Sequence, residues 1–168
     1  LGIDESETVK TIELKKLNIC LVSHFTENID SVAKITVPNK EEYSKKHNHS
    51  FRYHKGRLSN RHPGWDKILL LKEVLESNKY DYVVWIDNDA YITNQEIRFD
   101  FICNNNPDTK LIIASEDNYR NVKNLNPDLD YTELHNLRII NTGVFILKND
   151  KWSIDFLNKV WETKSNTN

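Results

Sequence analysis

The chain has 168 residues, of which 38% are hydrophobic and 29% are charged, and its formal net charge is −2. These values are ordinary for a soluble globular protein, and the length suffices for one domain with a sizeable core. The low net charge argues against a nucleic-acid partner, and no apolar run approaches the roughly 20 residues that span a bilayer. With Cys20 and Cys103 as its two cysteines, the chain predicts buried free thiols rather than a disulfide framework.

The first part of the chain predicts two strands with a helix between them. Residues 17–25 ("LNICLVSHF") form a continuous apolar run of strand length, the pattern of a strand buried on both faces. A short polar helix is expected next, with Pro38 or Asn39 near its start and acidic residues in its first turn. The aromatic-rich stretch 50–55 ("SFRYHK") then predicts a second strand.

The clearest helix follows over residues 62–78, where Pro63 precedes apolar residues at helical spacing. The apolar stretch over residues 137–149, interrupted at Gly143, predicts either one strand or two. The remaining expected elements are strands over residues 80–87, 110–116 and 137–149, and a closing amphipathic helix over residues 150–164.

Strands that alternate with helices predict an α/β fold with a mostly parallel sheet covered on both faces. The polar connector over residues 116–136 is long, and loops of that length tend to be functional or mobile. The ends, residues 1–14 and 163–168, are expected to be frayed. The tryptophans lie on apolar faces and are expected in the core, namely Trp65, Trp85, Trp152 and Trp161.

Two carboxylates, Asp87 and Asp89, come directly after the buried run of residues 80–86. In open α/β sheets, ligands bind beyond the carboxyl ends of the strands. Asn88 should point the other way in an extended chain, so the two aspartates share one side. Two hard oxygen ligands form half a site for Mg²⁺ or Mn²⁺, which the phosphates of a diphosphate would complete. The alternative is a turn or helix-capping pair.

Other polar residues allow two interpretations each. Asn141, Thr142 and Gly143 interrupt an apolar strand, which indicates either close approach of a ligand or a β-bulge. Glu116 and Asp117 follow a strand, and either contact a ligand or begin a solvated loop. The histidines lack partners at zinc-binding spacing, so solvated side chains are expected at His47, His49, His54 and His62.

Four blocks of sequence, in order, resemble one family of retaining glycosyltransferases. This family includes fungal α-galactosyl- and α-1,6-mannosyltransferases and plant xyloglucan xylosyltransferases. The blocks are "NKEEYSKKHNHSFRY", "HPGWDKILLLKEVL", "YDYVVWIDNDAYITN" and "NTGVFILKNDKWSIDFLNKVW", which together span about residues 39–161. Asn48 and His49 depart from the family, which usually has Gly-Tyr there, and this puts the local turn in question.

The resemblance implies a GT-A fold, a Rossmann-like nucleotide-binding sandwich, with Mn²⁺ or Mg²⁺ and a UDP- or GDP-sugar donor. Asp87 would lie near the ribose or the metal, and Asp89 would be the firmer metal ligand. Lys67 matches the family lysine that faces the donor phosphates. The other implied donor-binding residues are Ser23, His24, Phe25, Tyr43, His47, Asn88, Asn141, Thr142 and Gly143. For Tyr43 and His47, the alternative is an apolar anchor and a helix-end residue.

The resemblance also implies transfer of galactose, mannose or xylose to a glycan or glycoprotein acceptor. The family continues past the last block with an acceptor segment and a metal-binding histidine, which this chain lacks. Residues 1–168 are therefore expected to form a single donor-binding domain without that segment. The alternatives are a non-catalytic sugar-nucleotide-binding scaffold and a metal-dependent phosphohydrolase. The compartment stays open: a Golgi lumen for a eukaryotic relative freed of its anchor, or the cytoplasm for a viral or microbial one.

Overall fold

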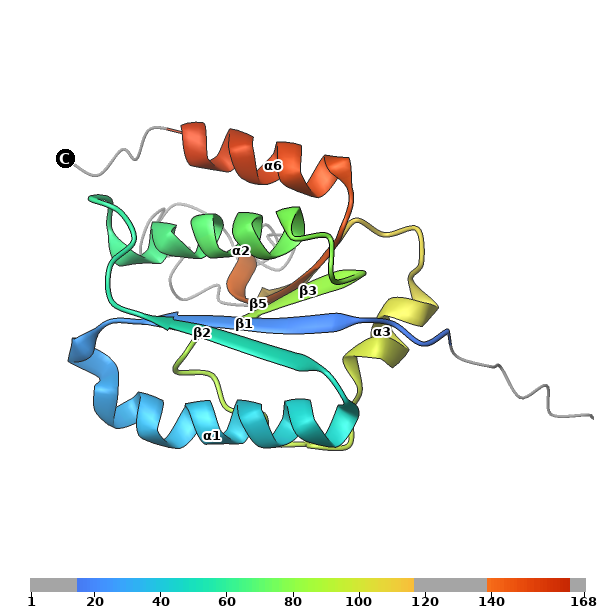
Figure 1. The fold of residues 1–168 in the computed structure, drawn as a ribbon, viewed down its shortest axis with the longest axis horizontal. Helices are drawn as coiled ribbons and strands as arrows, with labels where there is room; N and C mark the ends of the chain where they lie inside the picture. The colour runs from blue at the N-terminus through green and yellow to red at the C-terminus, as the bar shows by residue number, and fades with distance from the viewer. Residues whose placement is uncertain (1–14, 117–138, 164–168) are drawn as a thin grey trace, which may run out of the picture.

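The computed structural model describes residues 15–116 and 139–163. Helices cover both faces of a central sheet, with α2 and α6 on one face and α1 on the other (Figure 1). In chain order the elements are β1 (Ile19–Phe25), the 3-10 turn η1 (Glu27–Ile29), α1 (Asp30–His47), β2 (Ser50–Lys55), the 3-10 turn η2 (Pro63–Trp65), α2 (Asp66–Glu76), β3 (Tyr82–Ile86), α3 (Phe99–Asn105), β4 (Leu111–Glu116), β5 (Ile139–Lys148) and α6 (Lys151–Glu162).

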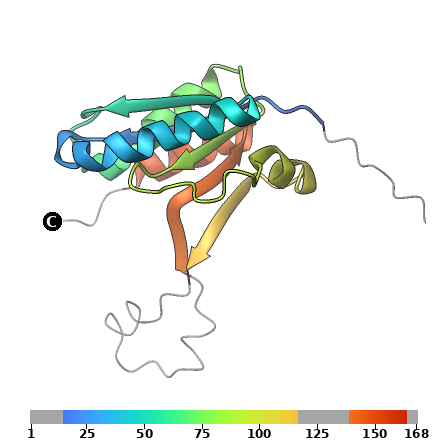
Figure 2. The ribbon, with the colours of Figure 1, turned by 90° about the horizontal axis from the view of Figure 1, so that it is seen from below.

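The five-stranded sheet has the order β2-β1-β3-β5-β4. β1 runs parallel to both β2 and β3, whereas β5 runs antiparallel to both β3 and β4. Every strand except β5 therefore points the same way, which confirms the mostly parallel sheet. The carboxyl ends of β1, β2 and β3 meet at one edge of this sheet. Figure 2 shows that β4 and β5 extend together away from the three layers.

The central strand β3 contributes side chains to two hydrophobic cores, because successive side chains of a strand point to opposite faces of the sheet. On one face, Val83 and Trp85 pack with α2 and α6, where Leu71 is fully buried. On the other face, Val84 and Ile86 pack with residues of α1 and α3. Because each large apolar side chain contributes about 1.5–3 kcal/mol when fully buried, this double burial fixes the strand end in place.

Helix α1 begins at Asp30, so the predicted start near Pro38 is wrong. Ala33 and Val37 from the unexpected first turns pack against Phe25 at the end of β1. That burial compensates for a proline inside the helix, which lacks an N–H and clashes with the preceding turn. Asn48 caps the end of the helix in the left-handed conformation, with φ at 56°.

Two further differences separate the structure from the sequence-based expectations, and they concern α3, which was not predicted, and Trp152. Of the two alternatives for the apolar stretch around Gly143, one continuous strand is confirmed as β5. Its pairing with β4 jumps from Ile113 opposite Phe145 to Ala114 opposite Asn141, an irregularity of the bulge kind. Trp152 does not join the core, because 45% of it is exposed.

The predicted positions of β1, β2, β3, β4, α2 and α6 agree with the structure, apart from small shifts at their ends. Cys20 and Cys103 are buried free thiols, as expected. Within the two described ranges, no helix combines the length and the apolar character that crossing a bilayer requires. The predictions for the ends of the chain and for the connector after β4 fall mostly outside the described residues, and so does Asp117.

Candidate active site

Asp87 lies at the carboxyl end of β3, and its side chain is held by two donors. The indole N–H of Trp85 donates to Asp87 Oδ1 at 2.6 Å, and Lys67 Nζ donates to the same oxygen at 3.1 Å. The backbone N–H of Asp87 donates to the carbonyl oxygen of Gly143 at 2.7 Å. Hydrogen bonds of this kind hold the carboxylate group in one orientation. The structure thus fixes an aspartate side chain where the fold places ligands.

Lys67 reaches this carboxylate from the start of α2. Its Nζ also donates to the carbonyl oxygen of Thr142 at 3.1 Å and lies 5.0 Å from the centre of the Trp85 ring. The side chain is 15% exposed, so its ammonium group is partly shielded from water. A cation over the face of an aromatic ring gains about 0.5–2 kcal/mol. Lys67, Asp87 and Thr142 are therefore brought together, as the sequence predicts.

Gly143 lies where β5 passes the side chain of Asp87. A Cβ at this position would stand 2.9 Å from Asn141 Oδ1 and 3.3 Å from Asp87 Oδ2. The Gly143 N–H donates to Asn141 Oδ1 at 2.7 Å, which closes the local turn of the bulge. The irregular pairing of β5 with β4 fits the bulge interpretation, and the close neighbour of the glycine is the acidic side chain itself. Asn141, Thr142 and Gly143 all belong to this site.

Asp89 is exposed, and the Asp87 side chain is 38% exposed, so solvent reaches both carboxylates. The donors to Asp87 act on Oδ1, while Oδ2 faces Gly143. This arrangement fits two carboxylate ligands for Mn²⁺ or Mg²⁺. Within the described residues, no cluster of three or more His, Cys, Asp or Glu could hold a metal ion. Phosphates and water would have to supply the other ligands.

The side chains predicted at the end of β1 are used for structure. Ser23 is fully buried, and its hydroxyl donates to the carbonyl oxygen of Ile86 at 2.6 Å. His24 Nε2 is 2.6 Å from the carbonyl oxygen of Gly56, and Phe25 belongs to the small core beneath α1. Ser23 thus bonds the residue that precedes Asp87, while His24 contacts the loop after β2 and Phe25 packs beneath α1. The described contacts of these three side chains are structural.

Tyr43 and His47 lie on the second half of α1, which runs away from the carboxyl edge of the sheet. The Tyr43 hydroxyl donates to the Ile97 carbonyl oxygen at 2.8 Å and accepts the Phe99 N–H at 3.2 Å. His47 Nε2 is 2.7 Å from the carbonyl oxygen of Gln95. These contacts fit the alternative of a structural anchor and a helix-end residue. The structure does not bring the two residues to the acidic pair.

Two consecutive residues of α1, Asn39 and Lys40, hold the acidic turn and were not singled out from the sequence. The Asn39 side chain accepts the Ile92 N–H at 2.8 Å and donates to the Ile92 carbonyl oxygen at 3.1 Å. Lys40 is 0% exposed, and its Nζ donates to the carbonyl oxygens of Asn88 and Ala90 at 3.0 and 2.7 Å. A buried lysine has no sequence signature of its own.

Asp66 is a second functional neighbour that sequence reasoning missed. It is 0% exposed and precedes Lys67 at the start of α2. Its Oδ2 accepts the Leu58 N–H at 3.0 Å, and its Oδ1 accepts the Ser59 hydroxyl at 2.5 Å. The same Oδ2 lies 3.8 Å from His24 Nε2. Asp66 thus joins the loop after β2 to the helix that presents Lys67.

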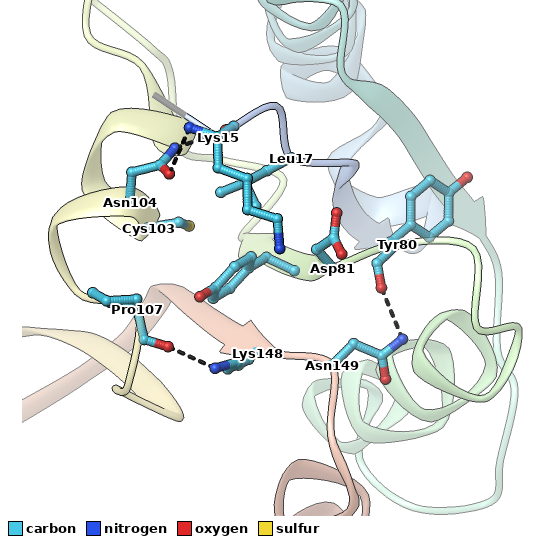
Figure 3. A pocket seen from close by; sticks show the side chains of 10 residues that line it. Lys15, Leu17, Tyr80, Asp81, Cys103, Asn104, Pro107, Lys148 and Asn149 are labelled. Atoms are coloured by element: carbon cyan, nitrogen blue, oxygen red, sulfur yellow. Dashed lines mark hydrogen bonds between the residues drawn. The ribbon is translucent and has the colours of Figure 1, made fainter. Parts of the chain in front are cut away.

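Figure 3 shows a cavity of about 200 Å³ at the opposite edge of the sheet, where β1 and β3 begin. Its polar groups already bond to one another. Asp81 Oδ2 accepts the Asn18 N–H at 2.8 Å, Lys148 Nζ donates to the Pro107 carbonyl oxygen at 2.6 Å, and Asn104 bonds the backbone of Lys15. The cavity lies away from Asp87 and is not the candidate active site.

A three-layer α/β domain with an Asp-x-Asp turn after a central strand is the architecture of the GT-A glycosyltransferases. The model of the galactosyl transferase GMA12/MNN10 family matches residues 15–168, so the chain belongs to this family. The fold and the family that the four sequence blocks indicated are therefore confirmed.

Two curated relatives are named as glycosyltransferases. Xyloglucan 6-xylosyltransferase 4 of Arabidopsis thaliana is 27% identical over 123 residues, which cover 72% of this chain and 21% of that protein. Probable glycosyltransferase 2 of Oryza sativa subsp. indica is 29% identical over 124 residues, or 73% of this chain and 23% of that protein. The chain thus spans about a fifth of the length of these relatives.

One solved structure has the same fold at low sequence identity. It is a glycosyltransferase involved in the glycosylation of the major capsid of PBCV-1, with a TM-score of 0.64 and 19% identity. The match covers 89% of this chain and 68% of that one. This similarity supports the α/β fold described above.

Proposed function

We propose that this domain binds a nucleotide sugar through a divalent metal and belongs to a retaining glycosyltransferase that acts on a glycan or glycoprotein acceptor. One observation carries the proposal: Lys67, Asp87 and Thr142 meet beside Trp85 at the carboxyl end of a central strand, next to the exposed Asp89. Two carboxylates and a lysine at one edge suit a metal-bound diphosphate better than a neutral ligand.

Asp89 and Oδ2 of Asp87 would be the protein ligands of Mn²⁺ or Mg²⁺. The metal, when bound, neutralises charge on the leaving diphosphate. Lys67 is placed to add a second positive charge beside the same phosphates, because its Nζ is 3.1 Å from Asp87 Oδ1. Trp85 and Thr142 keep that ammonium in position. In a retaining transfer, the acceptor hydroxyl attacks the face from which the leaving group departs.

Galactose, mannose and xylose differ by single hydroxyls or one hydroxymethyl group, and the shape of the pocket decides between them. The choice of nucleotide and of acceptor depends on the shape of the site as well. A screen of UDP- and GDP-sugars, with Mn²⁺ or Mg²⁺, would identify the donor from its hydrolysis or transfer. We expect turnover of one sugar nucleotide, and the sugar in the product should keep the anomeric configuration of the donor.

Asp89→Ala is the variant for this screen, because the Asp89 side chain is exposed and would be a ligand of the metal. The exposed Lys151→Ala on α6 is a matched surface control. We expect Asp89→Ala to lose at least about 100-fold in turnover, the scale of removing one transition-state stabiliser. If the wild type binds a donor yet neither transfers nor hydrolyses it, a non-catalytic binding domain replaces the enzyme. Equal turnover by wild type and Asp89→Ala would contradict a metal role for Asp89.

A further inference from the structure

Lys40 is a fully buried cation that the proposed chemistry does not use. Its Nζ donates to the carbonyl oxygens of Asn88 and Ala90, the two residues that flank Asp89. Burial of an ammonium group is expensive unless its charge is compensated. Carbonyl dipoles satisfy its hydrogen bonds without neutralising its charge. The compensating charges must therefore come from nearby anions.

The anions whose charges act on Lys40 are the two aspartates of the acidic turn. Burial lowers the pKa of Lys40 to about 8, while the charges of Asp89 and Asp87 act in the opposite direction. Lys40 therefore remains cationic at neutral pH. Asn39, the preceding residue, exchanges two hydrogen bonds with the backbone of Ile92, which fixes the turn relative to α1. The ammonium group of Lys40 is therefore held at a fixed position relative to the turn that carries Asp87 and Asp89.

The turn also contains a buried amide with free hydrogen-bonding capacity. Asn88 is 2% exposed, and neither its side-chain nitrogen nor its side-chain oxygen has a partner within the described residues. Native structures rarely leave such groups unpaired without a reason. Hydrogen bonds from α1 thus hold the segment that carries Asp87 and Asp89. Within the described residues, the Asn88 side chain in this segment has no hydrogen-bond partner.

The formal charges around the acidic pair sum to zero. Asp87 and Asp89 carry two negative charges, and two lysines oppose them, Lys40 from α1 and Lys67 from α2. A free divalent cation would meet a site with no net charge. A diphosphate would meet Lys67 directly and Lys40 only through the field of its buried charge. A metal–diphosphate complex, with a small net charge, suits this site best.

We propose that Lys40 is the internal counter-cation of the Asp87–Asp89 pair and makes this site select a divalent cation already paired with a diphosphate over the free cation. The inference rests on the proposed function, because it requires the pair to bind a metal–diphosphate. Lys40 acts through the field and the backbone of the turn, so it is a positioning residue. It touches neither the metal nor the donor.

Calorimetric titration of Lys40→Gln tests this role, because glutamine keeps a hydrogen-bond donor but removes the charge. Three affinities are measured for the intact chain: Mn²⁺ alone, the nucleoside diphosphate (UDP or GDP) alone, and the diphosphate with saturating Mn²⁺. We expect free Mn²⁺ to bind roughly ten-fold more tightly and the diphosphate alone to bind roughly ten-fold more weakly than to the wild type. A purely structural role for Lys40 would weaken both.

Two controls accompany this variant. Lys40→Arg keeps the charge and should retain the wild-type balance between the two ligands. Lys46→Gln removes a cation from the same helix, where Lys46 pairs with the exposed Glu96, and should change neither affinity. Unfolding midpoints of all variants separate folding defects from binding defects.

A second measurement needs no variant and remains decisive if Lys40→Gln does not fold. In the wild type, saturating UDP or GDP should strengthen Mn²⁺ binding about ten-fold or more, a coupling of ordinary size. Mn²⁺ that binds the wild type equally well with and without the diphosphate, yet no longer binds Asp89→Ala, would overturn the inference and leave the metal site in place. So would a Lys40→Gln protein in which both affinities shift the same way or stay unchanged. Failure of the wild type to bind any diphosphate would instead reject the proposed function.

Discussion

Gly143 determines how closely β5 can approach Asp87. The Gly143 carbonyl oxygen accepts the Asp87 N–H. A Cβ on Gly143 would point toward the Asp87 side chain. Its neighbour Asn141 accepts the Gly143 N–H and occupies the space that a Cβ would need. Any side chain at this position must push Asn141 or Asp87 aside. The glycine is therefore required by the site and not by its backbone angles.

Gly143→Ala should weaken metal-dependent diphosphate binding by about ten-fold and lower the free energy of unfolding by about 1–3 kcal/mol, the usual cost of overpacking. The new Cβ would be 2.9 Å from Asn141 Oδ1, closer than side-chain carbons approach without a shift. Calorimetry and urea unfolding measure the two effects. Gly64→Ala, whose Cβ would be 3.3 Å from His62 Nδ1, is the matched control. Unchanged diphosphate binding in Gly143→Ala would contradict this view of the site.

His49 is the residue whose titration should affect stability most clearly. Both ring nitrogens are buried without a partner in the described part of the chain, so the expected solvated histidine is wrong here. Burial lowers the pKa of His49, with Asp100 opposing and with His47 and Arg98 reinforcing that shift. The unfolded chain therefore takes up a proton below about pH 6.5 that the folded chain resists.

The free energy of unfolding should fall as pH drops from about 6.5 toward the lower folded-state pKa of His49. His49→Phe should remove that part of the pH dependence, because phenylalanine keeps a ring beside those of Tyr43 and His47 without titrating. Urea unfolding between pH 7.5 and 5, in steps of about half a unit, measures it. Ile35→Phe, at an exposed position and without a titratable group, should leave the slope unchanged. An identical slope in wild type and His49→Phe would contradict the assignment.

Among the elements, β1 and β3 were predictable because continuous apolar runs of strand length mark strands buried on both faces. Helix α1 was not predicted in full, because few of its residues are apolar and Pro38 resembles a helix start. Helix α3 is short, and its buried side chains include Asp100, which interrupts the apolar pattern. Local sequence does not show that packing against Phe25 and Tyr43 stabilises these helices.

The proline inside α1 offers a direct test at this scale. Pro38→Ala should raise the free energy of unfolding by about 1–3 kcal/mol, because it restores a helical N–H and relieves a clash with the preceding turn. The loss of proline's restraint on the unfolded chain offsets part of this gain. Ile35→Ala, at a side chain that is 65% exposed, should change stability by less than about 0.5 kcal/mol. Chemical denaturation that shows Pro38→Ala to be less stable would contradict the argument.

The candidate site was only partly predictable for a related reason. Asp87, Asp89, Lys67 and Gly143 stand out because they follow or interrupt apolar elements at positions where ligands bind. Lys40 does not, because its role depends on which backbone carbonyls the fold brings to it. Tyr43 and His47 follow Lys40 on the same helix, yet their hydroxyl and imidazole groups contact the segment between β3 and α3. Family resemblance alone cannot separate these roles.

Across the whole molecule, the helices on the two faces of the sheet converge on one acidic turn. Lys40 reaches it from α1 on one face, and Lys67 reaches it from α2 on the other (Figure 1). β5, the one antiparallel strand among those described, supplies the bulge that lies against Asp87. The site therefore depends on all three layers.

The most direct test of the account is calorimetric titration of the intact chain with UDP and GDP, with and without Mn²⁺, for wild type and Asp89→Ala. We expect one nucleotide to bind the wild type, with an affinity that Mn²⁺ raises by about ten-fold or more, and we expect Asp89→Ala to lose that increase. Binding that neither Mn²⁺ nor the loss of the Asp89 carboxylate alters would contradict a metal-bridged nucleotide-sugar site.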